Sequence, residues 1–287
     1  MGLRVTTLSE NTATMSGCLA EWGLSILVET DEARVLLDTG KSISASHNAD
    51  ILGVDLSHID RMVLSHGHFD HTGGLRDVLA KMGGEVEIIA RPDMWQAKYH
   101  RNPGVRDKHA RRGVEDRYIG IPFRREELES LGAVFNLTRK PVRISNNIMT
   151  TGEVPMVTDF EDIDPDLYVK EDSGWQPDRV MDDMALIINT DLGLVVILGC
   201  AHRGIINTLY HAQQLTGVKQ IHTVVGGAHL ISASAERVRL TIAALKELDI
   251  KRLGLCHCTG MPAVSLLAQE FGGRFFFNNA GTRFSLP

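Results

Sequence analysis

The stretch that decides the interpretation of this chain is Ser65-His66-Gly67-His68-Phe69-Asp70-His71. Within it, four side chains that can bind metals stand inside six residues: His66, His68, Asp70 and His71. Neutral imidazoles and carboxylates are good ligands for zinc and related divalent metals, and a catalytic site leaves one coordination position open for water. His66 and His68 can converge on one ion, while Asp70 and His71 can turn toward a second. The stretch therefore predicts a site for one or two divalent metal ions.

Hydrophobic runs on both sides of this motif predict alternating strands and helices. In the first half we expect strands at 24–29, 33–37, 59–64 and 85–90, and helices at 46–52 and 75–81. In the second half we expect strands at 184–189, 194–198, 220–225 and 252–256, and helices at 205–215 and 235–248. Strand–loop–helix units in both halves predict two sheets packed face to face with helices outside.

Residues 91–180 interrupt this rhythm, and we interpret them as a lid or insertion within one domain spanning 1–287. The part from 91 to 125 holds ten Lys and Arg (Arg91, Lys98, Arg101, Arg106, Lys108, Arg111, Arg112, Arg117, Arg124 and Arg125) against four acids, a net charge of +6. The whole chain carries −6, so the remainder carries −12. Such a basic patch can draw a small anionic substrate to a cleft. Alternatively, the segment is a solvated helical surface that happens to be basic.

Composition excludes several classes of protein. With 43% hydrophobic and 23% charged residues, the chain is close to the globular average. It has no apolar run near the roughly 18 residues that a membrane span needs, and its polar beginning favours a cytoplasmic location. Four cysteines are too few for a secreted disulfide scaffold, which leaves buried thiols or metal ligands. The negative net charge argues against a general nucleic-acid binder.

Two segments resemble the metallo-β-lactamase superfamily. Val63-Leu64-Ser65-His66-Gly67-His68-Phe69-Asp70-His71-Thr72-Gly73-Gly74-Leu75 resembles its hallmark motif, and Asp38 in Leu36-Leu37-Asp38-Thr39-Gly40 matches its earlier aspartate. Segments 20–25, 151–155, 199–202, 226–230 and 256–260 resemble the branch related to 7,8-dihydropterin-6-methyl-4-(β-D-ribofuranosyl)-aminobenzene-5′-phosphate synthase. The resemblance implies an α/β (α+β) fold, a four-layer αββα sandwich with its site at one edge.

The resemblance also implies ligands from the second half of the chain. His257, just after a predicted strand, is our candidate for the last histidine. Cys200 stands where many relatives have a bridging aspartate. Either Cys200 is a thiolate ligand or the role passes to His202, which we favour. We expect Asp38 to orient a ligand imidazole, because such imidazoles need a partner on their other nitrogen.

The sequence leaves the roles of several other residues near the expected site open. Asp182 and Asp183 lie where relatives place a middle histidine, which puts a second metal ion in doubt. His229 is either beside the site or a supporting partner. Trp22 replaces a histidine common in the branch, and Glu153 lines the cleft or caps a surface turn.

We therefore predict a metal-dependent hydrolase or transferase acting on a phosphate-containing small molecule related to pterins. Its metal ligands would be His66, His68, Asp70, His71, His202 and His257, with Asp70 also catalytic. Zinc is the expected metal, with iron or manganese as alternatives. Lys and Arg of the lid would bind the phosphate, and a homodimer is the default assembly. The competing hypotheses are a non-catalytic or redox-sensing metal protein, in which Cys200, Cys256 and Cys258 matter more than water activation, and a nucleic-acid phosphodiesterase.

Overall fold

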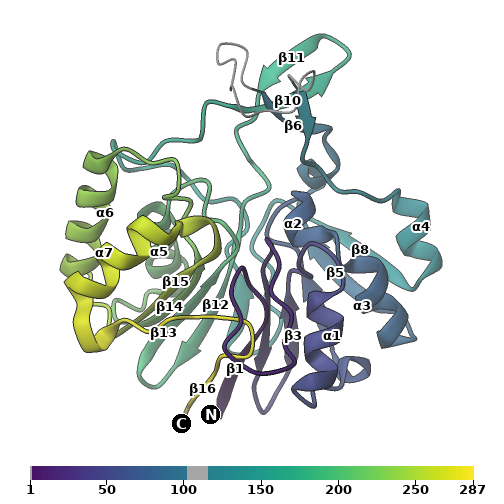
Figure 1. Ribbon diagram of the computed structural model, residues 1–287, viewed down its shortest axis with the longest axis horizontal. Coiled ribbons are helices and arrows are strands. Elements are labelled where there is room, and N and C mark those ends of the chain that lie inside the picture. The colour runs from purple at the N-terminus through teal and green to yellow at the C-terminus, as the bar shows by residue number, and fades with distance from the viewer. Residues whose placement is uncertain (1, 102–115) are drawn as a thin grey trace.

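The computed structural model describes residues 2–101 and 116–287, in which two large sheets face one another and helices cover their outer sides (Figure 1). The first sheet has the order β16 (Arg283–Leu286), β1 (Leu3–Ser9), β2 (Ser25–Glu29), β3 (Arg34–Leu37), β4 (Arg61–Val63), β5 (Val86–Ala90), β8 (Ala133–Leu137). The second has the order β15 (Arg252–Cys256), β14 (Ile221–Gly227), β13 (Gly193–Leu198), β12 (Ala185–Thr190), β9 (Ile148–Thr150).

Helices form the two outer layers. The first sheet is covered by α1 (Ser44–Ile51), α3 (Leu75–Met82) and α4 (Arg125–Ser130), and the second by α5 (Ile205–Thr216), α6 (Ala235–Glu247) and α7 (Met261–Phe271). Each of the three interfaces between layers has its own apolar core. The predicted α/β (α+β) fold, a four-layer αββα sandwich, is confirmed.

The core between the sheets consists of aliphatic side chains from both. Val28 and Val35 of the first sheet join Ile188 and Val195 of the second in one fully buried cluster. Burying each such side chain stabilises the fold by about 1.5–3 kcal/mol relative to leaving it in water. This core holds the two sheets, and therefore the two halves of the site, in a fixed relation.

The direction of the strands gathers the polar residues at one edge of the sandwich. Strands β3, β4 and β5 are parallel, as are β13, β14 and β15. The carboxyl ends of parallel strands meet at one edge of a sheet, where ligands of α/β proteins usually bind. Asp38 follows β3, Ser65 follows β4 by one residue, Cys200 follows β13 and His257 follows β15.

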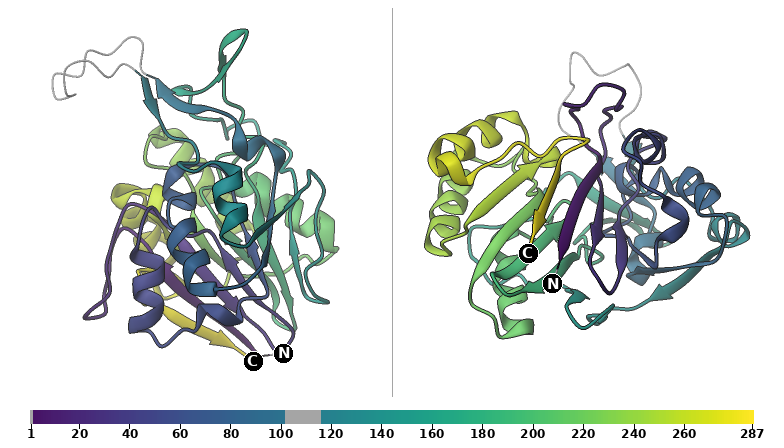
Figure 2. Two further views of the ribbon diagram at one scale, coloured as in Figure 1. Left: turned by 90° about the vertical axis from the view of Figure 1, so that its right-hand side faces the viewer. Right: turned by 90° about the horizontal axis from the view of Figure 1, so that it is seen from below.

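The predicted strands and helices outside 91–180 are all present, and each begins and ends within two residues of its prediction. The sequence did not predict β1, β16 or α7. Strand β1 buries Thr6, Thr7 and Ser9, so its pattern is weakly apolar. Its partner β16 comes from the opposite end of the chain, which brings the two termini together (Figures 1 and 2).

The segment 91–180 contains structure of two kinds. Strands β6 (Lys98–Arg101), β7 (Asp116–Tyr118), β10 (Leu167–Glu171) and β11 (Gly174–Pro177) form a small sheet above the sandwich (Figure 2). Strands β8 and β9, in contrast, are edge strands of the two large sheets. The small sheet is thus the part of the segment that stands apart as a lid would. Across the described residues, no helix combines the length and apolarity that a membrane crossing requires.

Candidate metal centre

The histidine motif lies in a loop whose backbone is fixed from both sides. Ser65 donates hydrogen bonds from its N–H and its hydroxyl to the Asp38 carboxylate, each 2.7 Å long. The Gly67 N–H donates to Asp182 Oδ2 at 2.7 Å. A Cβ on Gly67 would lie 2.2 Å from the carbonyl oxygen of Met94, so only glycine fits there. Helix α2 (Phe69–Thr72) begins directly after His68.

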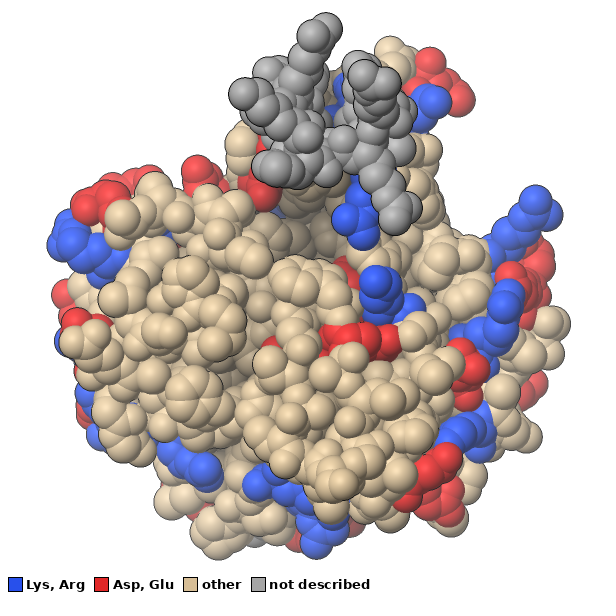
Figure 3. Space-filling model, viewed as in Figure 1, with Lys and Arg blue, Asp and Glu red and all other residues tan. Residues whose placement is uncertain are grey.

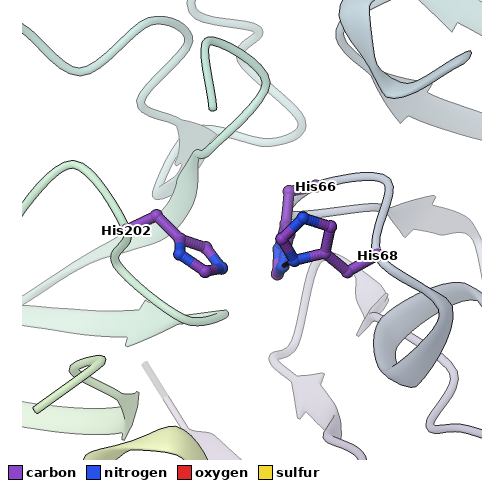
Figure 4. A group of neighbouring side chains, drawn as sticks. All are labelled: His66, His68 and His202. Atoms are coloured by element: carbon purple, nitrogen blue, oxygen red, sulfur yellow. Dashed lines mark hydrogen bonds between the residues drawn. The ribbon is translucent and has the colours of Figure 1, made fainter. Parts of the chain in front are cut away.

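Three buried histidines form the first group of candidate ligands. One ligand atom from each of His66, His68 and His202 lies within 4.8 Å of the others. Figure 4 shows His202 pointing across the edge of the sandwich toward the other two. Within the described residues, His68 Nε2 and both ring nitrogens of His202 have no hydrogen-bond partner. Buried nitrogens without a partner are costly, and they fit a site that binds a metal ion.

The electrostatic environment keeps this group uncharged. Burial and the neighbouring imidazoles lower the pKa of His66 and His202 well below the usual range. Burial and the nearby Lys98 ammonium lower the pKa of His68 to about 3. Because a histidine binds metal in its neutral form, the three imidazoles are ready ligands at neutral pH.

Asp70, His71 and His257 form a second group. Asp70 Oδ2 lies 3.4 Å from His257 Nε2 and 4.0 Å from His71 Nε2. Burial alone would raise the pKa of Asp70, but His71 and His257 hold it well below its usual value. Burial would lower the pKa of His71, but the Asp38 and Asp70 carboxylates outweigh this effect and raise it to about 9. As predicted, Asp38 contacts a histidine of the cluster, with Oδ2 2.7 Å from His71 Nδ1.

Two cysteines lie where the groups meet. Cys200 Sγ is 3.0 Å from His71 Nε2, and Cys200 belongs both to a group with His66 and His71 and to a group with His257 and Cys258. The structure thus brings together Cys200 and His202, which the sequence left as alternatives. Burial raises the pKa of the Cys200 thiol.

Of the two cysteines that flank His257, only Cys258 faces the cluster. The His229 N–H lies 3.3 Å from Cys258 Sγ. Burial alone would raise the pKa of Cys258, but hydrogen bonding to Cys200 and the charge of His257 lower it. Cys256 points into the core between the sheets, where its sulfur accepts from Asn278 Nδ2 at 3.3 Å. The sequence did not distinguish these two thiols.

Residues near the N-terminus hold His257, and no sequence pattern predicted these contacts. The Glu10 carboxylate accepts the His257 N–H at 2.9 Å, and Asn11 Oδ1 lies 2.9 Å from His257 Nδ1. His257 has a φ of 55°, a conformation that costs energy for a residue other than glycine. These contacts offset that strain and direct Nε2 toward Asp70.

Asp182 and Asp183 support the site from the side. The Lys98 ammonium is fully buried and pairs with Asp182 at 2.9 Å and with Asp178 at 3.0 Å. Asp183 accepts the N–H of Arg203 at 2.8 Å, and burial raises its pKa to about 7. Among the described residues, neither Asp182 nor Asp183 belongs to a ligand group.

The cluster opens into a cavity of about 420 Å³. His68, Asp70 and His202 line it, together with Trp22, Lys41, Phe69, His100, Arg117, Ile119, Leu167 and His229. Three of these residues belong to the small sheet: His100 lies on β6, Arg117 on β7 and Leu167 on β10. Figure 3 shows charged side chains around the hollow at this edge, below the small sheet.

Much of the predicted basic patch is occupied elsewhere. Arg91 is buried and pairs with Asp93 and Glu153, so Glu153 does not line the cavity. Lys98 is buried in its ion pairs, so neither it nor Arg91 is free for a substrate. The patch residues Arg106, Lys108, Arg111 and Arg112 lie outside the described part of the chain.

The sequence of the chain is similar to those of known proteins. A family model described as the metallo-beta-lactamase superfamily matches residues 23–145. A curated relative, the 7,8-dihydropterin-6-methyl-4-(β-D-ribofuranosyl)-aminobenzene-5′-phosphate synthase of Methanocaldococcus jannaschii, is 32% identical over 97% of this chain and 95% of its own length. The chain belongs to the metallo-β-lactamase superfamily.

Two further proteins resemble the chain over nearly its whole length. An uncharacterized protein of Methanocaldococcus jannaschii is 31% identical over 91% of this chain and 93% of its own length. The crystal structure of Tm1679, described as a metal-dependent hydrolase of the β-lactamase superfamily, superimposes with a TM-score of 0.82 at 29% identity and covers 98% of both chains. The match to the Methanocaldococcus jannaschii synthase confirms the resemblance that the sequence motifs predicted.

Proposed function

We propose that this protein is a metal-dependent hydrolase or transferase acting on a phosphate-containing small molecule related to pterins. The observation that carries the proposal is the cluster of buried ligand atoms beside a cavity of about 420 Å³; within the described residues, His68 Nε2, both ring nitrogens of His202 and His257 Nε2 have no hydrogen-bond partner. The relationship to the Methanocaldococcus jannaschii synthase supports the choice of substrate class. Fold alone would not support it.

Six residues would hold the metal. His66, His68 and His202 would form one position, and Asp70, His71 and His257 the other, with Cys200 between them. Zinc suits this mixture of imidazole, carboxylate and thiol ligands, whereas iron and manganese are the alternatives. A bound divalent metal lowers the pKa of a coordinated water toward neutrality and stabilises negative charge that develops on the substrate.

Asp70 would accept a proton from the attacking water, and Asp38 would keep His71 in place. Asp70 lines the cavity, and its pKa is held below the usual carboxyl value, so it is ionised at neutral pH. An ionised carboxylate there can orient a water molecule and accept its proton. Asp38 holds the ring of His71 through the contact at Nδ1, which keeps Nε2 turned toward the cluster.

The proposal is tested by metal analysis of protein purified without chelator, alongside hydrolysis of bis-p-nitrophenyl phosphate. We expect about two equivalents of metal, reduced by half or more in His66→Ala and in His257→Ala, with activity reduced in both. The matched control is His58→Ala, because the His58 side chain is 71% exposed and contacts Asp55 and Ser57, which lie outside the cluster. A wild-type protein without bound metal, or variants that retain metal and activity, would contradict the proposal.

One observation favours a second candidate, a metal protein that senses redox state. Cys200 and Cys258 lie in one ligand group with His257, so oxidation of either sulfur would remove a potential ligand. On this alternative, peroxide releases metal from the wild type but not from a Cys200→Ser and Cys258→Ser double variant. Hydrolysis would then be absent from fully loaded protein.

A further inference from the structure

We infer that Lys41 and Arg117 form a subsite for the phosphate group of the substrate, beside the histidine cluster. The inference rests on the proposed function, because it names the part of the cavity that would hold the anion. Both side chains line the cavity, although they come from separate elements. Lys41 lies in the loop between β3 and α1, whereas Arg117 lies on β7 of the small sheet.

Both cations lie beside the same aromatic ring. Lys41 Nζ lies 5.7 Å and Arg117 Cζ lies 5.2 Å from the centre of the Phe69 ring. Phe69 is the residue between His68 and Asp70 in the motif, so its backbone is bonded directly to that of two candidate ligands. Its N–H also donates to the carbonyl of Ile119 at 2.9 Å, two residues after Arg117. The position of the cations relative to the cluster therefore follows from the backbone.

Ion pairing distinguishes Arg117 from other cations of the basic segment. Arg91, Lys98, Arg101 and Arg125 each pair with a carboxylate. Within residues 2–101 and 116–287, neither Arg117 nor Lys41 has a carboxylate partner. A phosphate would supply the negative counter-charge that these two cations lack. Arginine can bind a phosphate through two parallel hydrogen bonds.

Part of the remaining cavity wall is apolar. Trp22, Ile119 and Leu167 line the same cavity as the two cations. A volume of about 420 Å³ is within the usual range for small-molecule sites. This combination fits a phosphate monoester or diphosphate attached to a flat, largely apolar group. The anion would lie against Lys41 and Arg117, and the ring system against the apolar wall.

Calorimetric titration with phenyl phosphate tests this subsite in the protein as purified. We expect Lys41→Met and Arg117→Gln each to weaken binding on the order of tenfold, because each removes one charge-assisted contact. Arg117→Lys should weaken it less, since the charge remains while the paired donors are lost. Arg124→Gln is the matched control, because Arg124 is exposed, belongs to the same basic segment and does not line the cavity.

Phenol, which lacks the phosphate, separates the charge contribution from the apolar one. Its binding should be the same in wild type and in Lys41→Met and Arg117→Gln. Unchanged affinity for phenyl phosphate in both variants would overturn the subsite, as would an equal loss of phenol binding. The titration needs no turnover, so the subsite can fail while metal content and hydrolysis hold. Equally, phosphate binding that depends on both cations can persist in a protein that fails the hydrolysis test.

Discussion

Asp38 Oδ2 lies 2.7 Å from His71 Nδ1, and both side chains are completely buried. The same carboxylate accepts two hydrogen bonds from Ser65, which directly precedes the histidine motif. One aspartate after β3 therefore fixes both the loop after β4 and the ring of His71. Because the other nitrogen of that ring faces Asp70 and Cys200, Asp38 sets the geometry of the second ligand group without belonging to it.

Replacing Asp38 with Asn should weaken metal binding by about 10- to 100-fold, because the orienting partner of a ligand imidazole loses its charge. Asp38 has a φ of 58°, which Asn tolerates well, so the backbone should not confound the result. Competition with a chromogenic chelator measures the affinity. Asp55→Asn serves as control, since Asp55 pairs with an exposed histidine. Equal affinity in Asp38→Asn and wild type would show that the contact does not support the centre.

Sequence patterns predicted the candidate ligands at this edge of the sandwich because the patterns that mark them span only a few neighbouring residues. The motif residues lie within six positions of one another, and the later candidates His202 and His257 follow, within four residues, strands whose apolar runs are easy to recognise. Parallel strands bring such positions to one edge whatever the loops between them do. The family resemblance supplied the assignment of His202 and His257, and the direction of the strands explains why residues so distant in sequence lie at the same edge as His66.

Contacts between distant segments could not be predicted in the same way. Glu10 lies 247 residues from His257, and no periodic pattern connects the two. Lys98 was counted among the substrate-binding cations, yet it is buried in an ion-pair network. Charge in a sequence shows how many cations are present, but only the fold determines which of them carboxylates neutralise.

Lys98→Met should destabilise the protein by about 3–5 kcal/mol, because it leaves Asp178 and Asp182 buried without their counter-charge. Urea denaturation followed by circular dichroism measures the free energy of unfolding. The control is Lys251→Met, whose pair with Asp249 is solvent-exposed and therefore contributes little to stability. A loss for Lys98→Met no larger than the control's would disprove the structural role of this network.

The same network predicts how stability responds to alkaline pH. Burial alone would lower the pKa of Lys98, but Asp182 and Asp178 raise it above the ordinary lysine value of 10.5. Its contribution to stability is therefore complete below that value and is lost as pH rises through the raised pKa. The free energy of unfolding of wild type should fall above this pH, and that of Lys98→Met should fall less. Parallel alkaline unfolding curves for the two proteins would contradict this account.

Gly67→Ala should damage both folding and metal binding. The new methyl would lie 2.2 Å from the Met94 carbonyl oxygen, so the loop carrying His66 and His68 must move. We expect a destabilisation of about 1–3 kcal/mol and a lower metal content. Gly84→Ala is the matched control, because no atom lies within 4 Å of its added Cβ. If thermal melts and metal content of the two variants agree, the close approach at Gly67 is not a constraint.

Replacing Cys200 should change the spectrum of the cobalt-substituted protein. Cys200 Sγ lies 3.0 Å from His71 Nε2 and joins two ligand groups, so a soft metal there should acquire a thiolate bond. Wild type loaded with Co²⁺ should then show sulfur-to-cobalt charge-transfer absorption in the near ultraviolet, and Cys200→Ser should lose most of it.

Cys256→Ser is the control for this experiment, since Cys256 is equally buried but points into the core between the sheets. Its cobalt spectrum should match that of wild type. A wild-type spectrum with visible cobalt bands but no charge-transfer absorption would show that nitrogen and oxygen ligands alone hold the metal. Cys200 would then be a packing residue, and the second ion would depend on Asp70, His71 and His257.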